Sequence, residues 1–323
     1  MFNLRGQVTE KMFELPFGIT GIDTGYIRPR LAACYLIVEN GMAGIIETGT
    51  AYSVETILDV LKLKGIEESS VRYIMPTHVH LDHAGGAGHL MRHFKDAKLI
   101  IHPRGARHMV DPSMLWNGTL AVYGEKSMYE LYQELIPVEK SRVIEAPDDF
   151  RLDFNGRELI FIDTPGHARH HFCIYDEKSG GFFSGDTFGM AYAELQCPDL
   201  PYIMPTTTPV HFDPDAWYQT LDRLMAFSPQ RMYLTHYGMV EQVEKLRDDL
   251  QRRIEVYVDI ATANRDKARR TELLTGLLLD QTLQELRQLK CGLPAAACRA
   301  MLQPDITLNV QGLEVWLDSH TAS

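Results

Sequence analysis

The sequence predicts an α+β fold in which two β-sheets pack face to face with helices outside them, followed by an all-helical extension. Apolar runs and helical stretches alternate through the first 240 residues in two strand-rich halves, an order that suits two packed sheets. Asn40-Gly41 separates two apolar runs, which is typical of a tight hairpin turn because both residues tolerate a positive φ. Beyond residue 240, apolar residues recur every three or four positions, as in amphipathic helices.

The first half contains this hairpin, one regular helix and an insertion. Ile57, Val60 and Leu61 lie on one side of a helix predicted at residues 54–63. The stretch 103–137 is rich in methionine, tryptophan and tyrosine and is predicted to be an insertion with helical segments. The predicted strands of this half lie at residues 31–38, 43–47, 71–75 and 99–102.

The second half repeats the pattern and then becomes helical. Its predicted elements are an amphipathic helix at 215–227 and strands at residues 159–163, 171–175, 181–184 and 231–235. A long helix is predicted from Val243, a second at 272–289, and a last one after Asp305, which is a plausible N-cap. We therefore predict a main domain over residues 1–240 and a helical extension over residues 241–323, which serves as a lid or as a dimer interface.

The composition argues against several classes of protein. Lysine and arginine number 32 against 43 aspartates and glutamates, and the net charge of −11 has the wrong sign for a nucleic-acid groove. A small neutral or ester-like substrate fits better. The five cysteines show no CxxC spacing, so we expect reduced and mostly buried thiols. Residues 1–10 lack the apolar segment of a leader, and no apolar run approaches the roughly 18 residues of a membrane span, so we expect a cytoplasmic location without a membrane partner.

The strongest chemical signal is a run that places four metal-binding side chains within six positions: Thr77-His78-Val79-His80-Leu81-Asp82-His83-Ala84-Gly85-Gly86. The run follows a buried strand, so its loop leaves a rigid edge and can hold ligands in fixed directions. In an extended loop His78 and His80 point the same way, and the turn brings Asp82 and His83 to a neighbouring point. The alternative is a polar surface loop, and three histidines beside an apolar strand argue against it.

Three further candidate ligands lie at the ends of predicted strands: His167, Asp186 and His236. Gly166 precedes the first and Gly185 the second, so the chain can leave each strand sharply. A single histidine at a strand end is more often a structural residue than a ligand. The shared position of all three candidates favours a common role.

Together these residues resemble the five-part signature of the metallo-β-lactamase superfamily, over roughly residues 20–240. The resemblance implies a four-layer αββα sandwich, with two metals at one edge of the sheets and a catalytic domain over residues 1–240. It also implies the ligand sets. His78, His80 and His167 hold the first metal, while the second is held by Asp82, His83 and His236, with Asp186 bridging both.

The implied chemistry agrees with this donor set. Imidazole and carboxylate suit zinc, and iron or manganese almost as well, so we expect two divalent metal ions per chain, zinc before the others. Two neighbouring cations need an anionic bridge, which Asp186 and a shared hydroxide supply. The metals lower the pKa of the bridging water, and the resulting hydroxide attacks a carbonyl or a phosphorus atom.

Departures from the patterns of particular members narrow the expected activity. Secreted β-lactamases usually carry a cysteine where this chain has Asp186, and flavodiiron proteins carry a glutamate at the His80 position. The segment His80-Leu-Asp-His-Ala-Gly-Gly86 is similar to that of the glyoxalase-II-like group, which contains lactonases and related esterases. We therefore expect a hydrolase that uses a metal-bridging hydroxide to cleave a small ester, lactone or thioester.

The candidate catalytic residues are Asp82, His170 and Tyr192. His170 or its neighbour His171 is a candidate proton donor or a group that orients a ligand, and the alternative is that both are ordinary residues at the start of a strand. Lactonases of this group place a tyrosine near the bridging aspartate to assist the substrate carbonyl. Tyr192 is the nearest tyrosine to Asp186 in the sequence, although its offset differs.

Two alternative functions remain open. The same dinuclear centre suits a phosphodiesterase, and a regulatory or binding protein would retain the metals and act through its helical surface. The helical tail resembles that of a thioesterase-like regulator of quinolone signalling. We expect a small-molecule substrate and a homodimer formed through the apolar stripe of the C-terminal helices.

Overall fold

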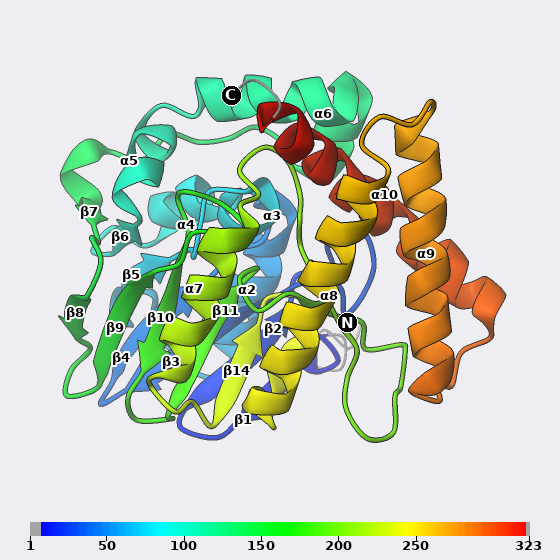
Figure 1. Cartoon of the computed structure of the whole chain (residues 1–323). Coiled ribbons are helices and arrows are strands. Elements are labelled where there is room, and N and C mark those ends of the chain that lie inside the picture. Colours follow the sequence, from blue (N-terminus) through cyan, green and yellow to red (C-terminus); the bar gives the residue numbers. More distant parts are fainter. Residues whose placement is uncertain (1–7, 321–323) are drawn as a thin grey trace, which may run out of the picture. The chain divides into compact units, whose positions relative to one another are not determined.

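The computed structural model of the protein describes residues 8–320, apart from the side chains at positions 122, 123 and 127 (Figure 1). Most of the segment analysed above as a possible leader therefore lies outside the described residues. The chain forms two compact units that interleave along the sequence. Unit 1 comprises Met1–Asp163, His170–Gly185 and Thr235–Gly238. Unit 2 comprises Thr164–Arg169, Asp186–Leu234 and Met239–Ser323.

Unit 1 contains a seven-stranded sheet whose strands are neighbours in sequence order: β1 (Met12–Leu15), β2 (Ile19–Asp23), β3 (Ala33–Glu39), β4 (Met42–Ile46), β5 (Val71–Met75), β6 (Lys98–Ile101) and β7 (Val143–Glu145). Strands β1 to β4 pair antiparallel, and β4 to β7 pair parallel. The predicted hairpin joins β3 to β4, with φ values of 47° at Asn40 and 82° at Gly41. The turn prediction is therefore confirmed.

Unit 1 also contributes four consecutive antiparallel strands of a second sheet: β8 (Phe150–Asp153), β9 (Glu158–Asp163), β10 (Phe172–Asp176) and β11 (Gly181–Gly185). The two sheets pack face to face through aromatic side chains. The ring of Tyr35 on β3 lies 5.3 Å from that of Phe183 on β11, and the ring of Tyr73 on β5 lies 6.1 Å from that of Phe154. Such aromatic pairs bury large apolar areas and hold the sheets together.

Helices of the same unit, coloured blue to cyan in Figure 1, cover the outer face of the seven-stranded sheet, while the last helix of the unit, at residues 113–131, packs on the helix before it. Ile57, Val60 and Leu61 point into the core from the first of these helices, as the sequence predicts. The predicted insertion contains the last two helices of this set. The helices are α2 (Val54–Leu63), α3 (Leu81–Ala84), α4 (Ala87–His93), α5 (Pro103–Val110) and α6 (Ser113–Leu131), with short 3-10 turns η1 (Ala51–Ser53), η2 (Glu68–Ser70) and η3 (Lys140–Arg142).

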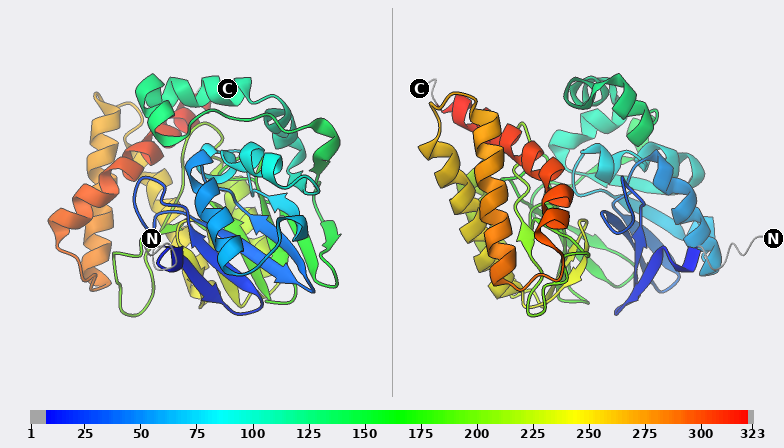
Figure 2. Two further views of the ribbon diagram at one scale, coloured as in Figure 1. Left: turned by 180° about the vertical axis from the view of Figure 1, so that it is seen from behind. Right: turned by 90° about the vertical axis from the view of Figure 1, so that its right-hand side faces the viewer.

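Unit 2 is mostly helical. Its elements are β12 (Met190–Ala191), β13 (Ile203–Met204), α7 (Pro214–Met225), β14 (Arg231–Leu234), α8 (Val243–Ala263), α9 (Arg270–Gln288) and α10 (Ala295–Ser319), while β15 (Gly238–Val240) begins at the end of unit 1. The three C-terminal helices contact one another, and α9 and α10 lie side by side (Figure 2). Asp213 caps α7 by accepting a hydrogen bond of 3.1 Å from the Ala216 N–H.

A buried ion pair joins α8 to α9. The Arg253 Nε atom donates to Glu285 Oε1 at 3.0 Å, and its guanidinium carbon lies 4.2 Å from the centre of the Tyr202 ring. Arg252 also donates to Glu285. Burial raises the pKa of Glu285, but the hydrogen bonds and charges of both arginines outweigh it, so this pKa lies below its usual value.

One predicted helix boundary is wrong. The last helix begins at Ala295, so Asp305 lies inside α10 and is not its N-cap. The prediction rested on the preference of aspartate for the N-cap position, and the structure instead continues the helix through Pro304, although proline disfavours a helix interior. Buried side chains on both sides of it, at Leu302 and Ile306, outweigh that preference. The predicted domain boundary at residue 240 stays a prediction.

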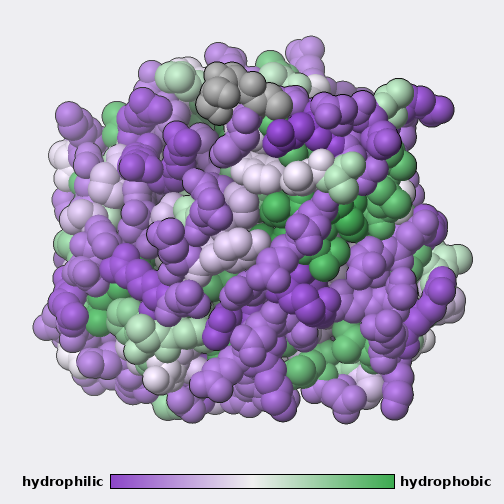
Figure 3. Space-filling model, in the orientation of Figure 1, coloured by the Kyte–Doolittle hydropathy of each residue, from purple (hydrophilic) through white to green (hydrophobic). Residues whose placement is uncertain are grey.

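The surface of the C-terminal helices carries scattered apolar residues. Figure 3 shows green patches among the hydrophilic residues over α8 to α10. Leu273 and Leu277 on α9 and Val315 on α10 are exposed. Within residues 8–320, no helix has the length and hydropathy that crossing a bilayer requires.

Candidate metal centre

The loop after β5 carries four of the predicted ligands. His78 and His80 lie in the loop itself, and Asp82 and His83 lie in α3. His78 and His83 are fully buried, while His80 and Asp82 are half-buried. Thr48 fixes α3 by donating its N–H and its hydroxyl to the His83 carbonyl, at 2.7 and 2.8 Å. The ligands therefore sit on an anchored segment.

Within unit 1, Asp82, His83 and His236 form a compact group in which one ligand atom from each lies within 4.8 Å of the others. The Nε2 atoms of His83 and His236 are 3.3 Å apart. Asp82 Oδ2 lies 3.7 Å from the first of these nitrogens and 3.4 Å from the second. The structure thus brings together the three residues that were predicted to hold the second metal.

The Nδ1 atoms of both rings face oxygen atoms that can only accept. His83 Nδ1 donates to Glu47 Oε1 at 3.0 Å, and His236 Nδ1 donates to the Leu31 carbonyl at 2.9 Å. In the neutral rings the proton therefore resides on Nδ1, and each Nε2 presents a lone pair. Two such nitrogens and a carboxylate oxygen within 3.7 Å of one another repel unless a cation lies among them. The donor set therefore fits a metal ion.

Glu47 contacts the candidate ligands and was not predicted from the sequence. Its buried carboxylate accepts from the Thr77 N–H at 3.0 Å, from the Thr77 hydroxyl at 2.5 Å, from the Thr235 hydroxyl at 3.0 Å and from His83. Since the Thr77 hydroxyl donates to Glu47, its oxygen accepts from His78 Nδ1 at 3.1 Å. Glu47 therefore orients two ligand rings, one directly and one through Thr77.

A sequence signal for Glu47 did exist. An acidic residue follows a buried apolar strand in the segment Glu47-Thr-Gly-Thr50, which we interpreted only as the end of a strand. Its φ of 60° is uncommon for a residue with a side chain. Such backbone geometry persists where the surroundings hold it, and here four hydrogen bonds do so.

Unit 2 holds the two remaining candidates, His167 and Asp186, on separate segments. His167 Nε2 lies 3.4 Å from Asp186 Oδ2, and its Nδ1 donates to the Thr206 carbonyl at 2.7 Å. The Thr206 hydroxyl donates to the Asp186 carbonyl at 2.8 Å, so one residue holds both candidates. The turn before His167 requires glycine, because Gly166 has a φ of 136° and a Cβ there would lie 2.5 Å from Trp217. Thr206 was also absent from the sequence predictions.

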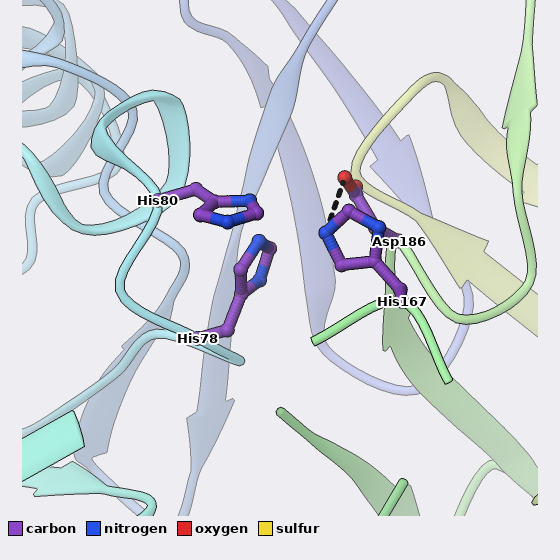
Figure 4. A group of neighbouring side chains, drawn as sticks. All are labelled: His78, His80, His167 and Asp186. Carbon is purple, nitrogen blue, oxygen red and sulfur yellow. Dashed lines mark ion pairs between the residues drawn. The ribbon is translucent and has the colours of Figure 1, made fainter. Parts of the chain in front are cut away.

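Figure 4 shows four of the candidate ligands. His78 and His80 come from one loop of unit 1, and their ring centres are 4.4 Å apart. His167 and Asp186 of unit 2 are joined by the dashed ion pair. The ligand atoms of each pair lie within 4.8 Å of one another. That both pairs share a metal ion stays a prediction.

His170 lies beside the ligand rings of unit 1. The centre of its ring is 5.5 Å from that of His80 and 6.1 Å from that of His78. Its neighbour His171 is fully buried, with a ring centre 4.8 Å from that of His78. His170 retains 9% of its exposure, so it is the better placed of the two for exchanging a proton with substrate.

Tyr192 lies in unit 2, where its side chain is buried. Its hydroxyl donates to the carboxylate of Asp305 on α10 and lies 3.7 Å from Met190 Sδ. Its catalytic role stays a prediction.

Leu81, between the candidate ligands His80 and Asp82, anchors the loop in an apolar cluster with the inserted helix α6. Met128 and Tyr132 are its other buried members. The Tyr132 hydroxyl lies 2.6 Å from that of Tyr26, which also packs on the cluster. The insertion therefore supports the ligand-bearing segment through Leu81.

Residues 27–236 match the sequence profile of the metallo-β-lactamase superfamily, and the chain belongs to this superfamily. The matched region contains all seven predicted metal ligands. Membership confirms the recognition made from the sequence motifs. It also confirms the α+β metallo-β-lactamase fold with a helical C-terminal region.

Three proteins illustrate what this chain is similar to. The metallo-β-lactamase fold-containing protein ST1585 of Sulfurisphaera tokodaii is 27% identical over 252 residues, which cover 75% of this chain and 88% of the relative. The atrochrysone carboxyl ACP thioesterase of Aspergillus fumigatus is 23% identical over 201 residues, covering 61% and 49% respectively. The metallo-β-lactamase family protein TTHA1429 of Thermus thermophilus has a similar structure, with a TM-score of 0.67, 18% identity and 95% of each chain covered.

Proposed function

We propose that this chain is a metal-dependent hydrolase that cleaves an ester, lactone or thioester bond in a small molecule. The group of Asp82, His83 and His236 carries the proposal, because two imidazole nitrogens and a carboxylate oxygen converge within 3.7 Å, an arrangement that a bound cation stabilises. The superfamily is generally hydrolytic, which supports the class of reaction.

We assign two divalent cations, zinc before iron or manganese, to seven residues. Asp82, His83 and His236 would hold one, His78, His80 and His167 would hold the other, and Asp186 would serve both. Support comes from the imidazole and carboxylate donors, which suit these metals. In four of the five rings the Nδ1 atom has an oxygen partner that leaves Nε2 for a metal: His78, His83, His167 and His236.

When bound, the cations lower the pKa of water and polarise a substrate carbonyl. The chain supplies orientation and proton transfer. Glu47 and Thr206 hold ligand rings at fixed angles through hydrogen bonds of 3.0 and 2.7 Å, so the site is formed before substrate arrives. His170, beside the His80 ring, holds a proton for the leaving group on its imidazole.

A thioester is the first substrate class to test. The Aspergillus fumigatus relative is named a thioesterase, and it covers 61% of this chain. The net charge of −11 favours neutral substrates over polyanions. Phosphodiester cleavage is the second candidate, because the same donor set serves phosphorus equally well.

The decisive variant is Asp186→Ala. We expect it to lose at least one metal ion per chain and to lower kcat/KM by about a thousandfold or more, since the proposed bridging carboxylate is removed. Elemental analysis and hydrolysis of a panel of thioesters, lactones and bis-p-nitrophenyl phosphate measure both effects. Asp199→Ala, at an exposed aspartate of the same unit, is the control and keeps wild-type values. The proposal is contradicted if Asp186→Ala keeps its metal content. It is also contradicted if the metal-loaded wild type cleaves nothing in the panel, and tight binding of a partner in that case favours a regulatory protein.

We also propose that the chain forms a homodimer through its C-terminal helices. Leu273, Leu277 and Val315 support this, because they expose apolar side chains on α9 and α10. Light scattering is expected to give about twice the chain mass of 36.7 kDa. A mass near that of one chain contradicts the proposal.

A further inference from the structure

Helix α10 packs directly on the segment that supports two candidate ligands. A Cβ atom at Gly312 would lie 1.6 Å from the Thr207 carbonyl oxygen, so only glycine allows this approach. Almost one turn earlier on the same side, Asn309 is only 1% exposed. The backbone of α10 therefore lies against residues 205–208 without an intervening side chain.

The Asn309 side chain clamps this segment at two points. Its Oδ1 accepts from the Thr207 N–H at 2.8 Å, and its Nδ2 donates to the Pro205 carbonyl at 2.8 Å. The Thr207 hydroxyl adds a third bond, to the Asn309 carbonyl at 3.0 Å. An amide is the neutral side chain that offers an acceptor and a donor in one plane, so asparagine matches both partners.

The residue between the two clamped positions is Thr206, which holds the ligands of unit 2. Its carbonyl accepts from His167 Nδ1 at 2.7 Å, and its hydroxyl donates to the Asp186 carbonyl at 2.8 Å. Thr206, Thr207 and Asn309 are all buried. A shift of the segment would therefore turn the His167 ring and displace Asp186 together.

We propose that Asn309 is a positioning residue of the metal centre, acting through Thr206 on His167 and Asp186. The C-terminal extension is then a structural part of the metal site, besides any role as a lid or dimer interface. This inference rests on the proposed metal binding. It adds the claim that a residue on the extension sets the metal affinity.

The test compares variants at neighbouring positions of α10. Asn309→Leu keeps a similar volume and removes both side-chain hydrogen bonds. Val310→Ala loosens the same buried helix and leaves the Asn309 hydrogen bonds in place, and Gln311→Ala alters an exposed amide. We expect Asn309→Leu to bind Zn²⁺ about tenfold more weakly in competition with a chromophoric chelator, and to change the visible spectrum of the Co²⁺-loaded protein. The other two variants keep wild-type metal affinity.

Two outcomes overturn the inference while leaving the proposed function intact. One is wild-type Zn²⁺ affinity in folded Asn309→Leu, and the other is an equal loss of affinity in Val310→Ala at a matched Tm. If Asn309→Leu does not fold, Thr207→Val removes a single hydroxyl and is expected to weaken Zn²⁺ binding about threefold; unchanged affinity there also overturns it. A wild-type protein that binds no metal contradicts the proposed function as well.

Discussion

The two units of this chain hold their candidate ligands by different chemistry. In unit 1, the ring of His83 donates to the buried carboxylate of Glu47, which also accepts from Thr77 and Thr235. In unit 2, the ring of His167 donates to a backbone carbonyl, that of Thr206. Two rings of unit 1, those of His83 and His78, are oriented by a charged side chain, directly or through Thr77. The ring of unit 2 is oriented by the main chain, as His236 of unit 1 is by the Leu31 carbonyl.

The difference determines what a single substitution can do. Hydrogen bonds to a charged group are about twice as strong as neutral ones, but the group can be removed by one mutation. No substitution removes the backbone carbonyl of Thr206, so mutations in unit 2 can only change the packing and hydrogen bonds that hold this carbonyl in place. Unit 1 is therefore the more sensitive of the two to mutation near the ligands.

Among the residues that orient the candidate ligands, Glu47 is expected to give the largest effect, in the variant Glu47→Gln. The amide directs an NH₂ group toward at least one of the donors that now meet a carboxylate oxygen, and the charge is lost. We expect Zn²⁺ affinity to fall by up to about 100-fold and the free energy of unfolding to fall by about 2 kcal/mol. Chelator competition and urea denaturation measure these changes.

Glu55→Gln provides the control for Glu47→Gln, because Glu55 is exposed on α2 and its substitution should change neither quantity. The claim that unit 1 is the more sensitive to mutation is wrong if Glu47→Gln binds Zn²⁺ as tightly as wild type. It also fails if Asn309→Leu weakens binding more than Glu47→Gln does.

Glu285→Gln is expected to lower stability without affecting metal binding. Glu285 is the buried carboxylate of unit 2 that lies between helices and away from the candidate ligands. Loss of its pairing with Arg253 should lower the free energy of unfolding by about 2 kcal/mol at pH 7 and leave Zn²⁺ affinity unchanged. Because the arginines hold the pKa of Glu285 below its usual value, its stabilising effect is complete above that value and is lost as the pH falls through the lower pKa. The difference from wild type should therefore narrow below about pH 4.

Urea denaturation from pH 3 to 8 tests this behaviour, with the exposed Glu272 as a control in the form Glu272→Gln. A Glu285→Gln variant that loses Zn²⁺ affinity would show that the helical network reaches the ligands. A stability difference that is constant with pH would contradict the assigned role of the carboxylate.

Regular elements with strong local signals were predictable from the sequence. The helix at residues 54–63 and the strand at residues 71–75 match α2 and β5, because their apolar spacing and their packing agree. The group of Asp82, His83 and His236 was predicted through a family resemblance and not from spacing, because the contact between the ligand loop and His236 depends on tertiary structure.

The residues that orient the ligands were not predictable in the same way. Glu47 lies at the end of a strand whose apolar residues predict only that the strand is buried. Thr206 acts partly through its backbone carbonyl, which every residue possesses. Asp305 was assigned to a helix start because aspartate is a preferred N-cap residue, whereas packing continues α10 through Pro304 and Asp305. Local sequence identifies donors and elements, while the partners that fix their direction depend on the tertiary structure.

Leu81 has a consequence for protein engineering. This side chain sits between two candidate ligands and is held by residues of α6, so the conformation of the loop depends on the inserted helix. Exchanging or shortening α6 alone would leave the Leu81 side chain poorly packed. The loop and the insertion should therefore be transplanted between relatives as one module.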